Sequence, residues 1–552
     1  MSFRLTSCAL GVFALCLAGI WGDQAAGQVQ SGGLAEPDLW TVGFQISREE
    51  SLPTQSWAAA DSDDLLTLTR VARTRRLSPV EQTLMRRLVL SAASAPESDK
   101  SDELLAERAR LMFQIGEASA AAQLLPSLKV APTGLNTDEV AVDLQLAIGE
   151  TEAACLSRAG EGREEDFWVK LRAVCFTLED RFEEAELAME LAASQGVTDG
   201  WLSNAIFAAS GGLNNKPAAR FDNGLSLAIS AKAGLEPSIS TIANSRLDLA
   251  AAIARQDTFS PAMRVQAAGV AAEAGLLPAQ EHRALYKALI ESEGFSPRTP
   301  LEVALHTTMK DGNDNSAKAR TLRAALGTAR GNPARFGAVS RLLLEDLEAL
   351  RPSDTTARMA TDFIMASLAA GAPDEALRWA ENAPGSDGVM FEPSWLVGIM
   401  VLAGADMPED TASKTVAALM ETAKTTKQKQ AAARLFVLWD AAGIDLPAKA
   451  RGFLADRPAP NKSASDKTAS PYLLASIEAA ARAQAGAELV FQALALTNGD
   501  AYSLTPNEAR TLVKSLRVLG QEDAARMLAI EATGYWRKSC LLYTSPSPRD
   551  RG

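Results

Sequence analysis

Apolar residues recur at helical spacing along most of the chain, and turn residues divide this pattern into pairs of short helices. The clearest pair spans residues 171–196, LRAVCFTLEDRFEEAELAMELAASQG, with its turn at residues 179–181. Ala185 and Ala192 follow Asp180 by five and twelve residues, so both lie on the second helix, two turns apart. Small side chains there would let two antiparallel helices approach closely. One hairpin cannot bury its apolar face alone, so the pattern predicts a stack of hairpins.

The same combination of a turn residue and later small residues returns along the chain. Gly116 and Gly149 lie in two IGE segments, 33 residues apart, and an Ala follows each at the fifth position. The residues that we assign to this close packing are Gly116, Ala121, Gly149, Ala154, Asp180, Phe182, Ala185, Ala192, Gly371, Ala376, Ala383, Gly443, Ala448, Ala455, Gly520, Ala525 and Ala532.

These segments resemble tetratricopeptide repeats, in which a turn glycine is followed by Ala at the fifth and twelfth positions. Phe182 stands at the aromatic position of that family, and the resemblance covers about a third of the chain. It implies an all-α fold, a right-handed superhelical α-solenoid of antiparallel helix pairs. The helical spacing persists between residues 197 and 360 but the motif fades, so we expect an irregular middle.

The N-terminus has the pattern of a secretory signal peptide over residues 1–27. Its apolar run, residues 8–21, is too short to span a bilayer, and small residues fit a cut after Gly27. We therefore expect no membrane span after cleavage. The alternatives are an uncleaved membrane anchor and lipidation at Cys8, because LTSC resembles a lipoprotein box.

Changes in composition predict the other boundaries. Residues 28–55 are polar and lack a sustained period, which predicts a flexible N-terminal arm on which Trp40 and Phe44 could dock. The α-solenoid is predicted over residues 56–457. Residues 458–471, rich in Pro and small polar residues, predict a linker that separates C-terminal helical hairpins over residues 472–539.

The end of the chain, residues 540–552, begins CLLYTSPSPRD and lacks a helical period. It resembles the translated end of a sequencing adapter. We therefore leave it out of the fold and expect the natural C-terminus to be missing.

Two cysteines remain once these ends are set aside. Cys155 lies on the second helix of one predicted hairpin, and Cys175 lies on the first helix of the next. Neighbouring helices in a stack bring such residues within bonding range, and an even pair in an exported protein predicts a disulfide. The alternative is two buried free thiols.

Composition supports helices and excludes some partners. Hydrophobic residues make up 47% of the 552 residues and aromatic residues only 6%, while Ala, the strongest helix former, is abundant. The formal net charge of -13 argues against nucleic acid and anionic membrane surfaces, because both need basic patches.

Residues that could carry chemistry are few. His282 and His306 lie on predicted helices without a partner His or Cys, so we interpret both as helix-surface residues. Residues 311–315, DGNDN, suggest a calcium loop, but Ser316 and Leu322 replace the Gly and Glu that such a loop needs, which favours a turn with a helix cap. No phosphate-binding loop and no G-x-S-x-G elbow is present.

Residues 291–297, ESEGFSP, resemble the catalytic Glu-Ser opening of soluble lytic transglycosylases, exported enzymes with a long helical superhelix. Their reaction needs one Glu as general acid in a lysozyme-like cleft. Here one extra residue precedes Phe295, and the rest of the motif is missing. Glu291 also ends a predicted helix, which disfavours catalysis.

The sequence predicts no catalytic residue, no cofactor and no metal site. Stacked helical hairpins form surfaces that commonly receive peptides or proteins. We therefore expect an exported, non-catalytic adaptor or scaffold of the cell envelope, in the bacterial periplasm, with an unidentified protein or peptide partner. The alternatives are a superhelical peptidoglycan-lytic enzyme with a degenerate or missing catalytic module, and a structural spacer.

Overall fold

The computed structural model of the chain describes residues 38–44, 46–47, 50–72, 74, 77–157, 163–212, 216–310, 312, 314–381, 391–456 and 469–537. All but the first of these residues belong to one compact unit, Leu39–Gly552. Every regular element within the described residues is a helix. The predicted all-α fold is confirmed.

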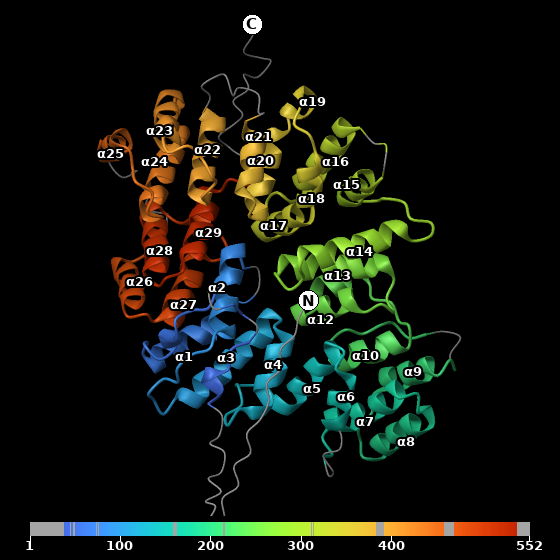
Figure 1. The fold of residues 1–552 in the computed structure, drawn as a ribbon. Coiled ribbons are helices and arrows are strands. Elements are labelled where there is room, and N and C mark those ends of the chain that lie inside the picture. The colour runs from blue at the N-terminus through green and yellow to red at the C-terminus, as the bar shows by residue number, and fades with distance from the viewer. Residues whose placement is uncertain are drawn as a thin grey trace, which may run out of the picture. The chain divides into compact units, whose positions relative to one another are not determined.

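The helices are short and follow one another closely (Figure 1). Those of the first half are α1 (Ser62–Val71), α2 (Pro79–Leu90), α3 (Ser101–Ile115), α4 (Ala118–Leu124), α5 (Thr137–Ala147), α6 (Thr151–Leu156), α7 (Asp166–Leu178), α8 (Phe182–Ser194), α9 (Gly200–Ala209), α10 (Gly224–Lys232), α11 (Ile239–Asn244), α12 (Leu247–Arg255), α13 (Pro261–Glu273) and α14 (Ala279–Glu291). Short 3-10 helices lie at η1 (Leu39–Thr41), η2 (Thr54–Ser56), η3 (Leu125–Ser127) and η5 (Ala501–Ser503).

The helices of the second half continue the same pattern. They are α15 (Pro300–Met309), α16 (Asn315–Ala329), α17 (Pro333–Leu342), α18 (Leu344–Ala349), α19 (Asp354–Ala357), α20 (Ala360–Ala370), α21 (Pro373–Ala380), α22 (Phe391–Ala403), α23 (Thr411–Thr422), α24 (Thr426–Ala441), α25 (Ala448–Ala455), α26 (Pro471–Arg482), α27 (Gly486–Thr497), α28 (Pro506–Val518) and α29 (Glu522–Thr533). None of the described helices is long and apolar enough to cross a membrane.

Consecutive helices pack against each other in pairs, as an α-solenoid requires. Among these pairs are α7 with α8, α12 with α13, α15 with α16, α20 with α21, and α28 with α29. The predicted arrangement of neighbouring helix pairs is therefore present. The right-handed superhelix stays a prediction.

The six turns singled out in the sequence share one backbone geometry. Each turn residue has a positive φ, from +62° at Asp180 to +86° at Gly116. The next residue donates its amide N–H to the carbonyl five residues earlier, at 2.8 to 2.9 Å. This hydrogen bond is that of the Schellman motif, which ends a helix in the left-handed conformation. Glycine adopts this conformation without strain, and Asp is one of the few other residues that tolerate it.

Most of the small residues after these turns are buried between helices. At the fifth position, the fully buried residues are Ala121, Ala154, Ala185, Ala376 and Ala525. Ala192 and Ala532, at the twelfth position, are also fully buried, and Phe182 is half-buried. Ala383 lies outside the described residues.

The turn at Gly443 is an exception, and the packing role predicted for Ala448 and Ala455 is wrong. Both side chains are exposed. Helix α25 begins only at Ala448, after Pro447, and the residue that it buries is Ala450. This shift puts the residues at the fifth and twelfth positions on the solvent side of the helix.

The arm predicted over residues 28–55 docks on the helices from Leu39 onward. Trp40 and Phe44 are buried, and the Trp40 ring lies 5.6 Å from the ring of Trp57. The fully buried Arg108 of α3 donates hydrogen bonds to four backbone carbonyls, which belong to Trp40, Val42, Val89 and Ser91. This guanidinium ties the arm to the end of α2.

Helices near the two ends of the described chain pack against each other. Helix α2 contacts α27 and α29, and α1 contacts α27 (Figure 1). The Val80 amide donates to Glu531 Oε1 at 2.8 Å, and the Arg87 guanidinium donates to Gln521 Oε1 at 2.7 Å. A linear solenoid has contacts only between neighbouring repeats. The contact of α1 and α2 with α27 and α29 is therefore a feature that the predicted fold did not include, and we call it the junction.

Helices α26 to α29 occupy the region predicted as C-terminal hairpins. They do not stand apart, because α24 packs on α28 and the first two helices pack on α27 and α29. The predicted linker lies mostly in residues 457–468, outside the described residues, as do the predicted signal peptide, the arm up to residue 37, and residues 540–552.

The buried apolar residues form two clusters. The larger cluster runs from the docked arm through α1 to α5 and α10 to α29, so α5 and α10 contribute residues to both clusters. The smaller cluster belongs to α5 to α10, with Trp168, Leu171 and Ile229 among its members. The region α5 to α10 therefore has a core of its own.

Candidate functional site

The disulfide lies in the region with the smaller core. Cys155 of α6 and Cys175 of α7 are bonded, with their Cα atoms 5.6 Å apart. Both residues are buried, and they lie on consecutive helices, as predicted. The bond closes the connection between α6 and α7, part of which lies outside the described residues.

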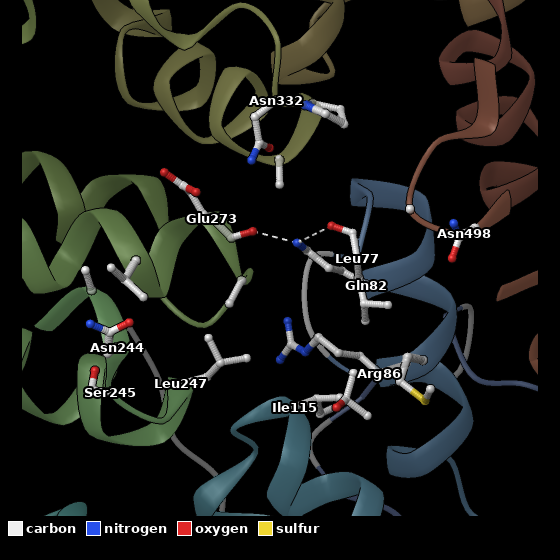
Figure 2. Close-up of a pocket in the computed structure, with 18 of the residues that line it drawn as sticks. Leu77, Gln82, Arg86, Ile115, Asn244, Ser245, Leu247, Glu273, Asn332 and Asn498 are labelled. Carbon is white, nitrogen blue, oxygen red and sulfur yellow. Dashed lines mark hydrogen bonds between the residues drawn. The ribbon is translucent and has the colours of Figure 1, made fainter. Parts of the chain in front are cut away.

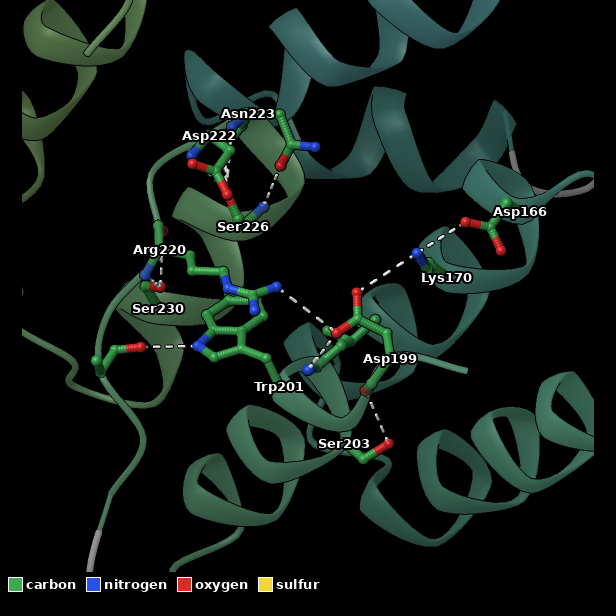
Figure 3. Close-up of polar contacts among 12 residues, drawn as sticks. Asp166, Lys170, Asp199, Trp201, Ser203, Arg220, Asp222, Asn223, Ser226 and Ser230 are labelled. Carbon is green, nitrogen blue, oxygen red and sulfur yellow. Dashed lines mark hydrogen bonds and ion pairs between the residues drawn. The ribbon is translucent and has the colours of Figure 1, made fainter. Parts of the chain in front are cut away.

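A polar pocket of about 430 Å³ opens at the N-terminal ends of α5, α7, α9 and α10 (Figure 3). We call it the acidic pocket. Its lining residues are Glu139, Glu165, Asp166, Phe167, Lys170, Asp199, Trp201, Leu202, Arg220, Asp222, Asn223, Leu225 and Ser226. Five of these side chains are carboxylates and two are cations, which gives a formal charge of 2 − 5 = −3.

Asp199 organises the centre of the acidic pocket (Figure 3). Its carboxylate accepts the Leu202 amide at 3.1 Å and so caps α9. It also lies 3.4 Å from Lys170 Nζ and 3.7 Å from the Arg220 guanidinium. Lys170 pairs in addition with Asp166 at 2.8 Å. Both cations are therefore already neutralised inside the pocket.

Trp201 forms an aromatic wall of the pocket. Its indole N–H donates to the Ala218 carbonyl at 2.7 Å, and the Arg220 guanidinium stacks 4.8 Å from the ring centre. The indole is thus fixed in place, with one face covered by a cation.

Two carboxylates of the acidic pocket have no counter-charge. Glu165 and Asp222 are exposed, and neither side chain has a hydrogen bond or ion pair within the described residues. Burial, together with the nearby charge of Glu165, raises the pKa of Glu139 above its ordinary value. The partial positive charge of the helix ends offsets part of this negative field, but a cationic group would be attracted to it more directly.

A second cavity, of about 490 Å³, lies where α2, α11 to α13, α17 and the loop after α27 meet (Figure 2). Gln82 crosses it and donates to the carbonyls of Leu77 and Glu273, at 3.2 and 2.6 Å. Asn332 accepts the Arg335 amide and caps α17. The polar side chains of this cavity thus hold segments of the fold together.

The other charged residues of this cavity are also engaged. Arg86 donates to the Gly275 carbonyl and pairs with Glu117. The Glu273 carboxylate pairs with Arg335 at 2.6 Å. We therefore interpret this cavity as a structural junction and the acidic pocket as the better candidate for binding.

Of the two histidines, His282 does not lie on the helix surface, which corrects the prediction for that residue. His282 is buried with no hydrogen-bond partner for either ring nitrogen, and burial together with Arg341 lowers its pKa to about 4. It is therefore neutral at pH 7. His306 is half-buried, and its ring lies 5.7 Å from that of Phe295. The helix period placed both on helices correctly but did not show which neighbours cover them.

The remaining candidates for chemistry lie apart from both cavities. Glu291 ends α14 with 65% of its side chain exposed, and its nearest basic group is Lys287 at 3.9 Å. Asp314 caps α16, as the turn-and-cap interpretation predicts. Across the described residues, no three His, Cys, Asp or Glu side chains come close enough together to hold a metal ion.

Sequence reasoning did not single out the acidic pocket, although a signal was present. Asp199 and Asn223 cap the free amides at the starts of α9 and α10, and Asp166 is the first residue of α7. Capping residues on successive helices that run the same way gather at one end of a stack. The spacing of such caps could have located the pocket.

No family model matches the chain, and no curated protein matches it significantly. The resemblances to tetratricopeptide repeats and to a sequencing adapter therefore stay predictions.

Proposed function

We propose that the protein is an exported, non-catalytic adaptor that binds a basic segment of a partner protein in the acidic pocket. The observation that carries this proposal is the pair of unpaired carboxylates, Glu165 and Asp222, beside a pocket in which both cations are already neutralised. A Lys or Arg side chain of a partner would supply the missing counter-charge, and Phe167 and Trp201 offer apolar contact.

Export is supported by the signal-like N-terminus and by the disulfide, since disulfides persist mainly in oxidising compartments. A periplasmic location agrees with both features. The role of a scaffold or adaptor is supported by the paired helices, because stacked helix pairs present extended binding surfaces.

The peptidoglycan-lytic alternative finds no support at Glu291. A general acid of that reaction needs a cleft that raises its pKa, but this side chain is largely exposed at a helix end. We therefore do not retain a lytic function as the second candidate.

A peptide-binding experiment tests the acidic pocket directly. The probe is a fluorescent peptide of alternating Lys and Ala, and the variant is Glu139→Gln with Glu165→Gln and Asp222→Asn, which spares the cap at Asp199. We expect about tenfold weaker binding, since each screened charge contributes about 0.5 kcal/mol. Affinity should also fall with added salt.

The matched control removes three charges from the neighbouring helix α8, with Glu183→Gln, Glu186→Gln and Glu190→Gln, all exposed and outside the pocket. It should bind the peptide nearly as the wild type does. An equal loss of peptide affinity in both triple variants would show that only the overall charge matters. It would refute the proposal that the peptide binds in the acidic pocket.

Affinity capture from an envelope extract tests the adaptor role. We expect the wild-type chain to recover one stoichiometric protein that the pocket triple variant recovers poorly. Repeated failure to recover any such protein would contradict the adaptor role and would favour the role of a structural spacer.

A further inference from the structure

A small third cavity lies between the start of α2, helices α17 and α20, and the end of α29. It measures about 190 Å³ and is lined by Pro79, Phe336, Leu368 and Ile530 among others. Trp536 also faces it. The walls are thus mainly apolar, and they come from segments far apart in the sequence.

Three polar side chains that line this cavity have hydrogen-bonding atoms without a partner among the described residues. Arg341 has no hydrogen bond or ion pair with any described residue, although it is largely enclosed. Glu531 accepts the Val80 amide with Oε1, while its Oε2 is buried and has no partner. Tyr535 is buried, and its hydroxyl makes no hydrogen bond within the described residues. Buried polar groups are nearly always paired, so the unpartnered Oε2 of Glu531, beside a half-buried guanidinium and a phenol that have no partner among the described residues, points to a ligand.

The charge state of these groups indicates which ligand fits. Burial lowers the pKa of Arg341, and no carboxylate opposes that effect, yet the guanidinium stays protonated at neutral pH. Burial raises the pKa of Glu531 to about 8 and also raises the pKa of Tyr535. Both therefore carry protons at pH 7. The cavity then holds one uncompensated positive charge beside groups that can donate hydrogen bonds.

We propose that this cavity binds a small apolar carboxylate, held by the Arg341 guanidinium and with its hydrocarbon body against Phe336, Leu368 and Trp536. Guanidinium groups bind carboxylates through paired N–H donors. A ligand site for a drug-sized molecule measures at least about 300 Å³. A space of 190 Å³ therefore suits a smaller molecule, such as a short-chain fatty acid or an apolar amino acid.

Calorimetry with the full chain tests the proposal, with hexanoate and leucine as carboxylate probes and 1-hexanol and hexylamine as controls. We expect saturable binding of at least one carboxylate and none of the alcohol or the amine at the same concentration. Binding of hexanoate but not of leucine would point to a fatty acid as the natural ligand. Binding of leucine but not of hexanoate would point to an amino acid. No saturable binding of either carboxylate up to about 10 mM, near the limit of small-molecule affinity for a site of this kind, would overturn the proposal.

Arg341→Met removes the charge and keeps an apolar side chain of similar length. It should fold, because the guanidinium has no protein partner to lose, and it should weaken carboxylate binding at least tenfold, as loss of one charge-assisted contact predicts. Arg335→Gln on the same helix is the matched control, since Arg335 pairs with Glu273 outside this cavity. Equal binding in Arg341→Met and in the control would refute the role of Arg341.

Gly337→Ala tests the position of the guanidinium without changing any charge. A Cβ at Gly337 would lie 3.2 Å from an Arg341 guanidinium nitrogen, so that group must shift. Because Ala favours a helix more than Gly does, the variant should fold at least as well as the wild type. We expect binding several-fold weaker than in the wild type, and unchanged binding would contradict the proposed geometry. The pocket triple variant described above should bind hexanoate normally, which separates this site from the acidic pocket.

Discussion

The region α5 to α10 and the junction of α1 and α2 with α27 and α29 are held together in different ways. In α5 to α10, neighbouring helices share a small core, a disulfide joins consecutive helices, and the pocket charges lie near the surface. At the junction, buried polar groups such as Glu81 and Glu531 connect segments that are far apart in the chain.

The two regions therefore depend on different ranges of sequence. Contacts between neighbours in the chain close short loops and follow from local patterns. The hydrogen bond from Val80 to Glu531 spans 451 residues, so it depends on how every intervening helix packs. Four experiments test whether the two regions are stabilised as described.

The largest effect should come from pH at the junction. The pKa of Glu531 is raised from 4.5 to about 8, mainly by burial and further by Glu81 and Asp500, while the nearby Ser78 hydroxyl and the Val80 amide act in the opposite sense. The folded state thus keeps a proton that the unfolded state releases. The contribution of Glu531 to the free energy of unfolding is therefore fully present below pH 4.5. It is lost as the pH rises to about 8, which lowers the free energy of unfolding by up to roughly 5 kcal/mol.

Glu531→Gln cannot ionise, so it should remove this decline. Urea unfolding of both proteins at pH 5 and pH 8.5 measures it. Asp523→Asn, exposed on the same helix, should decline like the wild type. A Glu531→Gln variant with the same pH dependence as the wild type would show that the carboxyl stays ionised when folded.

Arg108→Met should destabilise the large core by about 3 to 5 kcal/mol, because it removes a buried guanidinium and its four hydrogen bonds to backbone carbonyls, including the buried carbonyls of Val89 and Ser91. Burial lowers the pKa of Arg108 to about 10, so it is charged at pH 7. Arg70→Met, which removes an exposed ion pair with Glu103, should cost 1 kcal/mol or less. Chemical denaturation of both variants checks the prediction, and a similar small loss in each would show that the four bonds contribute little.

Replacing Cys155 and Cys175 with Ser should cost about 3 kcal/mol, on the chain-entropy estimate for a loop of this length. The loss should be local, because α5 to α10 have their own core. Hydrogen exchange should speed up in α6 and α7 and stay unchanged in α2 and α29. Faster exchange throughout the chain would show that the two regions unfold together.

The smallest effect concerns the turns. Gly149→Ala should cost about 1 kcal/mol, because φ is +84° there, although an added Cβ would meet no atom within 4 Å. Gly269 also has free space but lies inside α13, so Gly269→Ala should stabilise by about 0.5 to 1 kcal/mol. Thermal unfolding of both variants would test this. If both shift stability in the same direction, backbone conformation is not what selects glycine at these turns.

Local features of the fold could be predicted from the sequence. The spacing of Ala after Gly116 and Gly371 indicates helices that meet closely, and the structure buries Ala121 and Ala376. Capping and turn residues act over a few positions, so one sequence is enough to recognise them. The same rule was wrong at Ala448, because Pro447 delays the start of α25.

Long-range features could not be predicted in this way. Arg108 and His282 look like polar positions on amphipathic helices, and only the docked arm and the neighbouring helices bury them. The acidic pocket could be found in part, since its caps lie at helix starts. The third cavity could not be predicted from the sequence, because Arg341 and Glu531 line the same cavity only through the packing of the whole chain.

The docking of α2 on α27 and α29 has a consequence for biosynthesis. A ribosome makes α2 first, and its apolar surface stays without those partners until residues 486–533 have also been made. The nascent chain must therefore persist in an unfinished, chaperone-accessible form for most of its synthesis. Under the export proposed above, this delay would keep the polypeptide competent for translocation.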